Sequence, residues 1–580
     1  MFTKLLVANR GEIAVRVLRA CRDLDIATVG VFSSADADAV HVRHADEAYN
    51  IGPVTPSESY LSIANIMDAA RRSGAQAVHP GYGFLAENGD FARAVVEAGM
   101  AWVGPPPGVI DAMGDKTAAR RAASDAGVET VPGTKQPVRE PEEVRAFARE
   151  HGLPLAIKAA AGGGGKGFRV VASEGDIEGA LAGAAREAQA YFSSSDVYLE
   201  RYLERPRHIE IQVMGDASGA VLSFPERDCS LQRRHQKLVE ESPSPALNPN
   251  VREAIMEAAT RVSKQVGYRN AGTCEFLLDS DGVTFYFLEM NTRLQVEHPV
   301  TEWVTGIDLV KAQLLVAAGE PLGFAQDDIE LRGHSIECRI NAEDPGAGFM
   351  PTPGLIVDYR EPAGPGVRVD SGAATGTRMA QTYDPLISKL ITHGWDRDEA
   401  RRRMLRALDE YTIAGISTTI PWHRLMLRDD RFVRGDYHTG TVEHDMDPAV
   451  LERPAAHEPV PGAPEIAQRR FAVELNGKRF AVVARERLDT TVRPSKPPPP
   501  SPGGAVGGGG TEVLAAPMQG TIVNVLVEAG QEVEAGDVVC VLEAMKMENS
   551  ILAHTSGRIE ELRVDAGQSV ETGAPLAIIR

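Results

Sequence analysis

The C-terminal part of the chain contains one block of sequence twice. The segment from Gly520 to Gly536 reads GTIVNVLVEAGQEVEAG, and the segment from Gly557 to Gly573, 37 positions further on, reads GRIEELRVDAGQSVETG. Both alternate apolar and polar residues in short runs that end at glycines, a pattern typical of β-strands and tight turns. A duplicated block of this kind predicts a small flattened β-barrel whose halves are related by a pseudo-twofold axis.

Lys546 lies between the two halves, in the sequence Glu543-Ala-Met-Lys-Met-Glu548. A lysine in a turn is most often only a solvated charge. The repeat favours a second interpretation, because a tight hairpin held by both halves can present one amine to a modifying enzyme. The stretch resembles the biotinyl domain, whose signature is Ala-Met-Lys-Met; the related lipoyl domain lacks these methionines. The resemblance implies biotin joined to Lys546 through an amide by a biotin protein ligase.

The totals limit the class of protein. With 580 residues, 24% of them charged, the chain is too long for one core and predicts three or more domains. A net charge of −20 argues against a general nucleic-acid or membrane-surface binder. Five scattered cysteines without a CxxC pair predict neither a disulfide framework nor a zinc site, and fit a reducing cytoplasm. We expect no signal peptide and no transmembrane segment.

The N-terminal half predicts two α/β units. A strand at residues 5–8, a helix at 13–22 and a strand at 28–32 form a βαβ start to a doubly wound sheet. In the second unit, a glycine-rich loop at residues 161–167 lies between two strands, so its backbone N–H groups can close over phosphates. It is not a Walker A loop, because a strand follows Lys166-Gly167. A glycine-rich hairpin beside a lysine on a strand, Lys158, resembles the ATP-grasp superfamily.

The hairpin from Gly272 to Pro299 carries the densest polar pattern. If the second strand stays extended to Glu297, its alternate residues Glu289, Asn291, Arg293, Gln295 and Glu297 share one face and line a cleft. An assumed register, with Asp279 opposite Val283, puts Glu275 opposite Phe287 and diagonal to Glu289. Two carboxylates and an amide oxygen are ligands suited to Mg²⁺ that also contacts nucleotide phosphates. The alternative is a solvent-exposed edge strand.

Two further patterns precede this hairpin. His208, Glu210 and Gln212 alternate with apolar residues and so share one face of a strand. The stretch from Cys229 to Lys237 concentrates basic and polar side chains in an otherwise acidic chain. Such a patch is either a solvated face or a site for an anionic substrate.

Residues 1 to about 445 resemble biotin carboxylase throughout. The matching motifs are Asn9-Arg-Gly-Glu-Ile, His79-Pro-Gly-Tyr-Gly-Phe-Leu, the 162–167 loop, Gln232-Arg-Arg-His-Gln-Lys-Leu-Val-Glu-Glu, Glu289-Met-Asn-Thr-Arg-Leu-Gln-Val-Glu-His and Glu337-Cys-Arg-Ile-Asn-Ala-Glu-Asp. The resemblance implies that ATP is surrounded by Lys116, Lys158, Gly164, Gly165, Glu200, Leu203, His208, Gln232 and His235. It implies Glu275, Glu289 and Asn291 as ligands of Mg²⁺ or Mn²⁺. Bicarbonate would be bound by Lys237, Arg293, Gln295 and Val296, with Glu297 as its base and Arg339 as the contact with biotin.

The expected organisation is an α/β multidomain chain with a C-terminal all-β barrel. We expect a pre-ATP-grasp doubly wound domain at 1–115, an ATP-grasp domain at 116–320, a biotin carboxylase C-terminal domain at 335–445, a linker at 446–510 and a biotinyl domain at 511–580. In the third, Tyr383 to Lys389 is a candidate turn and helix start. The linker is rich in Pro, Ala and Glu and contains an Asn-Gly hairpin at residues 471–483.

The family resemblance implies the chemistry. Glu297 would deprotonate bicarbonate, whose oxygen attacks the γ-phosphate of ATP to form carboxyphosphate, and released CO₂ would be transferred to biotin. No segment remains for a carboxyltransferase, so the layout resembles the α subunits of bacterial acyl-CoA carboxylases, especially the actinobacterial kind. These work with a separate β subunit on acetyl-, propionyl- or longer acyl-CoA, within a hetero-oligomeric complex that we expect to contain several copies of the chain. The alternatives are another ATP-grasp ligase with an unrelated carrier, and a non-catalytic carrier subunit.

Overall fold

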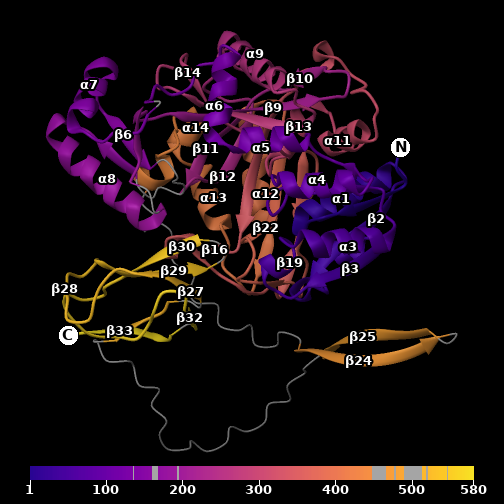
Figure 1. Cartoon of the computed structure of the whole chain (residues 1–580). Coiled ribbons are helices and arrows are strands. Elements are labelled where there is room, and N and C mark those ends of the chain that lie inside the picture. Colours follow the sequence, from indigo (N-terminus) through magenta and orange to yellow (C-terminus); the bar gives the residue numbers. More distant parts are fainter. Residues whose placement is uncertain are drawn as a thin grey trace, which may run out of the picture.

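The computed structural model describes residues 1–134, 136–159, 168–192, 195–446, 465–475, 478–488, 513–517, 520–544, 547–571 and 573–580. Within 465–488 the description covers the backbone alone. The expectations for Gly164, Gly165 and Lys546 therefore lie outside the described residues. Figure 1 shows a large α/β body, a separate two-stranded hairpin and a small all-β unit at the C-terminus.

The N-terminal unit is the doubly wound sheet that the sequence predicts. Its five strands are parallel in the order β3-β2-β1-β4-β5, and apolar clusters cover both faces. Asn88 caps the fourth helix by accepting a hydrogen bond from the backbone N–H of Phe91. The elements are β1 Lys4–Val7, α1 Gly11–Asp23, β2 Ala27–Ser33, α2 Val40–His44, β3 Glu47–Gly52, α3 Ile63–Ser73, β4 Ala77–His79, α4 Gly89–Glu97, β5 Ala101–Trp102 and α5 Pro107–Gly114.

Two buried histidines make this unit sensitive to acid. Burial is the largest effect on both His41 and His79, and it lowers their pKa from 6.5 to about 4. The unfolded chain therefore binds protons that the folded chain does not, so these residues contribute their full stability above pH 6.5 and lose it as the pH falls toward 4. With 1.36 kcal/mol per pKa unit, each contributes up to about 3 kcal/mol.

Buried carboxyl groups whose pKa is raised to about 7, such as Glu12 and Glu343, have the opposite effect on stability, so the contribution of a histidine is measured by comparison with its own variant. Differential scanning calorimetry at pH 7 and pH 5 gives the unfolding temperature of each chain. We expect His41→Gln to lose less stability, or gain more, between pH 7 and pH 5 than the original chain, whereas His444→Gln, at an exposed position, should behave like the original chain. The same temperature difference in His41→Gln and in the original chain would contradict the interpretation.

The second unit begins with a small sheet that frames the glycine-rich loop. β6 pairs with β7 and β8 in antiparallel fashion, so the loop between β6 and β7 joins neighbouring strands, as expected. Two helices pack on this sheet through an apolar cluster of their own. The elements are α6 Lys116–Asp125, α7 Pro141–His151, β6 Leu155–Ala159, β7 Phe168–Val171, α8 Ile177–Phe192 and β8 Val197–Arg201.

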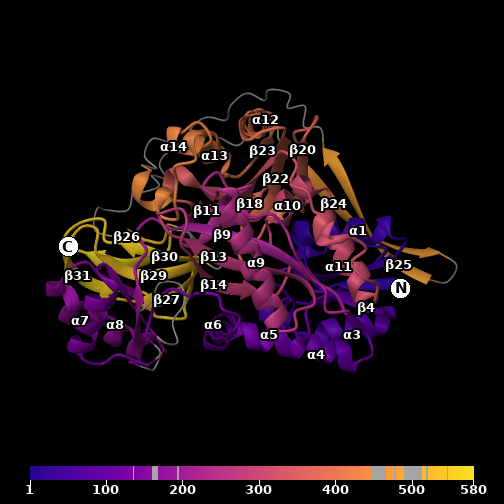
Figure 2. The same ribbon diagram turned by 90° about the horizontal axis from the view of Figure 1, so that it is seen from above.

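One antiparallel sheet runs through the rest of the body and crosses the expected boundary between the second and third domains. Its strand order is β14-β13-β9-β11-β12-β15-β22-β20, and β12 pairs directly with β15. Figure 2 shows β14, β13, β9 and β11 side by side, with β22 and β20 beyond. The strands are β9 Arg207–Gly215, β10 Val221–Ser223, β11 Arg227–Arg233, β12 Gln236–Ser242, β13 Asn270–Leu278, β14 Phe285–Asn291, β15 His334–Asn341, β20 Val367–Ser371 and β22 Leu386–Gly394.

Of the expected turn and helix start at Tyr383 to Lys389, the helix start is wrong, whereas Tyr383 does lie in a bend after a turn. Residues 386–394 form β22, which lies between β15 and β20. Both faces of β22 are buried, and one of them packs against α12. The sequence of β22 therefore does not alternate between apolar residues for the core and polar residues for solvent. Sequence periodicity could not distinguish this pattern from a short buried helix.

Helices cover the large sheet. α6 and α9 share an apolar cluster with β9, β13 and β14, and α12 shares another with β15 and β22. The helices are α9 Pro249–Gln265, α10 His298–Thr305, α11 Leu309–Ala317, α12 Arg397–Glu410, α13 Ile420–Met426 and α14 Asp430–Arg434. Short strands complete the unit: β16 Glu343–Asp344, β17 Met350–Pro351, β18 Gly354–Leu355, β19 Asp358–Arg360, β21 Arg378–Met379 and β23 Thr412–Ala414.

The C-terminal unit is the duplicated β-barrel that the repeat predicts. Its two four-stranded sheets have the orders β26-β33-β31-β28 and β30-β29-β27-β32. β27 and β31, β28 and β32, and β29 and β33 begin 37 positions apart, so each repeat supplies the same strands to opposite sheets. The strands are β26 Val513–Ala515, β27 Gly520–Val525, β28 Glu532–Val533, β29 Val538–Ala544, β30 Met547–Leu552, β31 Gly557–Leu562, β32 Ser569–Val570 and β33 Pro575–Ile579.

The hairpin between the body and the barrel agrees with the sequence expectation. β24 (Glu465–Leu475) pairs with β25 (Lys478–Leu488), and Leu475 lies opposite Lys478, which leaves only two positions between the strands. Among the described residues, we find no helix with the length and apolar character needed to cross a bilayer.

Candidate functional site

The ammonium group of Lys237, which is 10% exposed, joins three carboxylates within the large sheet. Nζ of Lys237 (β12) lies 2.5 Å from Oε2 of Glu210 (β9), 2.6 Å from Oε1 of Glu297 and 3.2 Å from Oε1 of Glu275 (β13). Burial alone lowers the pKa of Lys237, but these carboxylates outweigh it and raise the pKa well above its ordinary value. Lys237 is therefore a fixed positive charge.

Glu297 is held in its ionised form by cations on two sides. Nη2 of Arg339 (β15) lies 2.8 Å from its Oε2, and Lys237 contacts its Oε1. Burial raises the pKa of Glu297, but Lys237, Arg339 and Arg227 together lower it well below its ordinary value. Arg339 also contacts Glu240 (β12) through Nε, at 2.5 Å. A carboxylate that is free of protons at neutral pH can accept one from a substrate.

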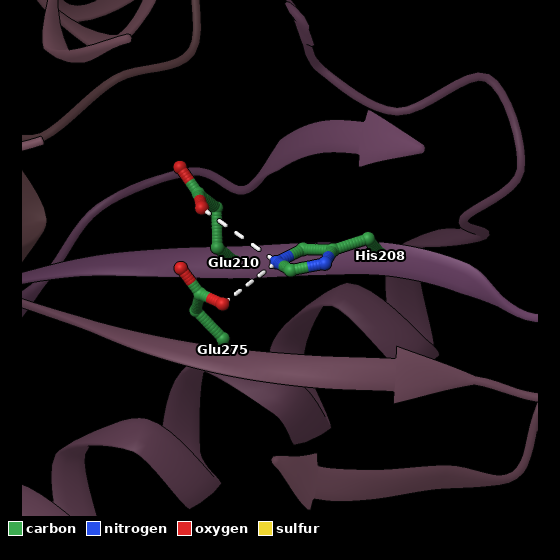
Figure 3. Close-up of side chains that lie close together, drawn as sticks. All are labelled: His208, Glu210 and Glu275. Atoms are coloured by element: carbon green, nitrogen blue, oxygen red, sulfur yellow. Dashed lines mark ion pairs between the residues drawn. The ribbon is translucent and has the colours of Figure 1, made fainter. Parts of the chain in front are cut away.

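Figure 3 shows the second cluster, in which His208 points between Glu210 and Glu275. Nε2 of His208 is 3.0 Å from Oε2 of Glu275 and 4.0 Å from Oε2 of Glu210. The three residues offer ligand atoms within 4.8 Å of one another. Burial lowers the pKa of His208, but Glu275 outweighs this effect and raises it. The arrangement confirms that His208 and Glu210 share one face of β9.

The register of the β13–β14 hairpin differs from the expected one. Glu275 lies directly opposite Glu289, not opposite Phe287, because the next pair is Phe276 with Phe287. Leu288 is thus an extra residue, and this bulge brings the two carboxylates closer than a regular ladder would. Burial and the charge of Glu275 raise the pKa of Glu289.

The prediction that the second strand stays extended beyond Asn291 is also wrong. β14 ends at Asn291, and residues 292–297 form bends and a turn before α10. The polar groups converge nonetheless: Gln295 donates to Oε1 of Glu275 at 2.8 Å, and Nη2 of Arg293 donates to Oδ1 of Asn291 at 2.9 Å. Nδ2 of Asn291 donates to Glu275 at 2.8 Å. Backbone curvature, rather than strand alternation, gathers these side chains.

Glu275, Glu289 and Asn291 fit a divalent cation. Glu275 is buried and lies directly opposite Glu289, which is partly buried, and Nδ2 of Asn291 donates to Glu275. Carboxylate and amide oxygens are ligands of Mg²⁺, and a cation between the two carboxylates would offset both burial and the charge of Glu275, which raise the pKa of Glu289.

The residues expected around ATP include Lys116 on α6, Lys158 on β6 and Glu200 on β8. Glu200 forms ion pairs with Lys158 and Arg120. Leu203 packs in a small apolar cluster with Val131 and Tyr286. Lys116 is the first residue of α6, and its charge acts on Glu289.

The basic stretch from Cys229 to Lys237 fits the two interpretations, a solvated face and an anion site, at different positions. Gln232 is buried directly opposite Lys237, whereas His235 lies exposed in the turn with a positive φ of 62°. One end of the stretch is thus part of the buried charge cluster, and the other faces solvent.

Three acidic residues at the site were not among the expected ones. Glu87 accepts from Nε of Arg293 at 2.8 Å, and Glu210 and Glu240 contact Lys237 and Arg339. Glu210 belongs to the alternating strand pattern, and Glu240 is one of the two glutamates that end the motif beginning at Gln232, so both had a sequence signal. Glu87 lies two positions beyond the His79–Leu85 motif, in the loop that follows β4.

Comparison with known families gives four matches along the chain. Residues 1–110 match the model "Biotin carboxylase, N-terminal domain", residues 115–325 "Carbamoyl-phosphate synthase L chain, ATP binding domain", residues 337–444 "Biotin carboxylase C-terminal domain" and residues 512–579 "Biotin-requiring enzyme".

Individual proteins agree. The chain is 47% identical to a biotin-dependent acyl-coenzyme A carboxylase alpha3 subunit of Mycobacterium leprae, over 100% of this chain and 98% of that protein. It is 52% identical to biotin carboxylase 1 of Bacillus subtilis, over 76% of this chain and 98% of that protein.

Among solved structures, the biotin carboxylase domain of Hydrogenobacter thermophilus 2-oxoglutarate carboxylase, in complex with MgADP and bicarbonate, matches with a TM-score of 0.71 and 48% identity. The match covers 77% of this chain and 98% of that one. Together with the carboxylate cluster and the duplicated barrel, these matches show that the chain belongs to the biotin-dependent carboxylases, as an ATP-dependent biotin carboxylase joined to its own biotinyl domain.

Proposed function

We propose that this chain is the α subunit of an acyl-CoA carboxylase. It carboxylates the biotin on its own Lys546, and a separate carboxyltransferase β subunit transfers the carboxyl group to acetyl-CoA, propionyl-CoA or a longer acyl-CoA, a reaction that supplies fatty acid biosynthesis. The observation that carries the proposal is the full-length match to an α3 subunit. The matched segments leave only residues 445–511 between them, which is too short for a carboxyltransferase domain.

We assign the roles by position. Lys116, Lys158, Glu200, Leu203, His208, Gln232 and His235, with Gly164 and Gly165, surround the nucleotide. Glu275, Glu289 and Asn291 hold Mg²⁺, which when bound neutralises the phosphate charge. Lys237, Arg293, Gln295 and Val296 bind bicarbonate, Glu297 removes its proton and Arg339 contacts biotin.

The charge cluster explains how Glu297 becomes a base. Lys237 depresses the pKa of Glu297 in the free protein. A bicarbonate anion at Lys237 competes with Glu297 for the ammonium group, so Glu297 loses part of the interaction that stabilises its ionised form. Its affinity for a proton rises at the moment when the hydroxyl of bicarbonate lies beside it.

Arg293 and Gln295 orient the same anion. Arg293 is already paired with Glu87 and Asn291, and Gln295 with Glu275, so both are held before the substrate arrives. Binding then requires exchange of partners rather than ordering of free side chains, which lowers its entropic cost.

Glu297→Gln tests the assignment of the base. The amide keeps the shape of the side chain but cannot accept the proton, so we expect kcat for bicarbonate- and free-biotin-dependent ATP hydrolysis to fall by about 100- to 10,000-fold. Glu343→Gln is the matched control: Glu343 is 2% exposed, its pKa is raised to about 7 by burial, and none of its hydrogen bonds reaches Lys237. Full activity of Glu297→Gln would remove Glu297 from the mechanism.

We propose that the chain functions as a homo-oligomer within this complex, in the cytoplasm. The related biotin carboxylase domain of the Hydrogenobacter enzyme is described as a dimer. A cavity of about 650 Å³ on this chain, lined by Arg16, Arg19, Trp303 and His393 among others, supports a contact surface, as does Trp395, which is 89% exposed. Tryptophan and arginine are enriched in protein interfaces.

A further inference from the structure

Lys389 connects three parts of the body from a completely buried position. It lies in the middle of β22, opposite Arg339 on one side and Asp370 on the other. Its side chain is 0% exposed, and its Nζ is 2.8 Å from the carbonyl oxygen of Val296, 3.2 Å from Oε2 of Glu12 and 3.8 Å from Oδ2 of Asp370. One ammonium group thus contacts the first helix, the turn before α10 and the neighbouring strand.

The carbonyl that Lys389 binds belongs to the peptide unit between Val296 and Glu297. Val296 is the proposed bicarbonate contact, and Glu297 is the proposed base at the N-terminal cap of α10. Lys237 and Arg339 hold the carboxylate end of Glu297. Lys389 holds its backbone end, so the two sets of contacts fix the base at both ends.

Within the part of the chain that the structure describes, Glu12 forms one ion pair, with Lys389. Neither of its oxygens has a hydrogen-bond partner among the described residues, and burial, the largest effect, raises its pKa to about 7. A Cβ on Gly372, at the end of β20, would lie 2.5 Å from the backbone nitrogen of Glu12, so the start of α1 touches the sheet directly. Asp370, in contrast, has a second partner in Arg368 at 2.7 Å.

We propose that Lys389 is a positioning residue, which holds the Val296–Glu297 peptide so that the base and the bicarbonate contact keep their relative orientation. The proposal rests on the proposed role of Glu297. Because Lys389 contacts no residue assigned to the nucleotide, its removal affects the reaction step and leaves nucleotide binding intact.

The test is Lys389→Met in the full-length biotinylated chain, which removes the ammonium group and keeps an unbranched apolar stem. We expect kcat for bicarbonate-dependent ATP hydrolysis with free biotin to fall by about 10- to 100-fold, with KM for ATP within about twofold of the original. Glu12→Gln removes the charge of the ion-pair partner and keeps the bond to Val296, so we expect its kcat to stay within about threefold.

A double variant makes the test valid even if Lys389→Met does not fold. Lys389→Met alone leaves Glu12 buried without its cation, which can prevent folding. Glu12→Gln/Lys389→Met removes both members of the pair, and we expect it to fold and to show the same low kcat as the single variant. Thermal unfolding of each variant verifies the fold.

The possible outcomes distinguish the role of Lys389 from the role of Glu297. If Lys389→Met or the double variant folds and keeps the kcat of Glu12→Gln, Lys389 is only structural and the proposal is wrong. A parallel loss of kcat, ATP affinity and thermal stability would overturn it equally. If Glu297→Gln is fully active, the assignment of Glu297 as the base and the positioning role of Lys389 are both wrong. If Glu297→Gln is inactive while Lys389→Met is active, only the positioning role of Lys389 is wrong.

Discussion

Arg339→Ala is expected to abolish the carboxylation of biotin. Arg339 lies between two buried carboxylates, with Nε 2.5 Å from Glu240 and Nη2 2.8 Å from Glu297. Its removal takes away the proposed contact with biotin and also one of the cations that keep Glu297 ionised. By analogy with the loss of a single charge-stabilising donor, we expect kcat with free biotin to fall by at least about 100- to 1,000-fold.

The same substitution should destabilise the fold. It leaves Glu240 and Glu297 without their shared partner, and removing one member of a buried ion pair typically costs about 3–5 kcal/mol. The effect on Glu240 is partly relieved, because burial already raises its pKa to about 7 and it can take up a proton. Activity must therefore be measured at a temperature where calorimetry shows the variant to be folded.

Arg397→Ala is the matched control for this prediction. Arg397 forms a two-point ion pair with another buried carboxylate of β12, Glu241, through Nε at 2.7 Å and Nη2 at 2.9 Å. Its loss should lower stability by a comparable amount and leave kcat unchanged, since neither residue contacts Glu297. If Arg339→Ala keeps full activity, or if Arg397→Ala loses activity equally, Arg339 has no specific role in the reaction.

Lys546→Arg is expected to abolish acyl-CoA carboxylation completely. The guanidinium group retains the positive charge but is not acylated, because it stays protonated. Lys546 is the only lysine between residues 511 and 580, so the domain has no substitute amine. The pairing of Ala544 with Met547 leaves two positions, one of them Lys546, between β29 and β30.

Two measurements on one preparation test this prediction. Intact-mass analysis of chain from a biotin-replete host should show a biotin adduct on the original chain and none on Lys546→Arg. ATP hydrolysis with free biotin should be the same for both, because the substitution lies in the carrier barrel and not in the carboxylate cluster. An adduct on the variant, or retained acyl-CoA carboxylation with a β subunit, would contradict the assignment of Lys546.

The local patterns predicted much of the architecture. The 37-residue repeat predicted both sheets of the barrel, because each repeat carries a complete set of strands and glycine turns. The strand, helix and strand expected at residues 5–8, 13–22 and 28–32 predicted the parallel start of the N-terminal sheet. Such features depend on neighbouring residues alone, so one sequence suffices to identify them.

The residue types needed for the chemistry could be read from the printed sequence, and the resemblance to a family indicated their roles. How these residues meet depends on the packing of distant strands: Lys237 joins carboxylates from β9, β13 and the turn before α10, and a one-residue bulge sets Glu275 opposite Glu289. Neither strand β22 nor the contact of Lys389 with Val296 was predicted from the sequence. The physical reason is that burial allows charged side chains only where distant segments supply their partners, and the pairing of distant strands leaves no periodic trace in the sequence.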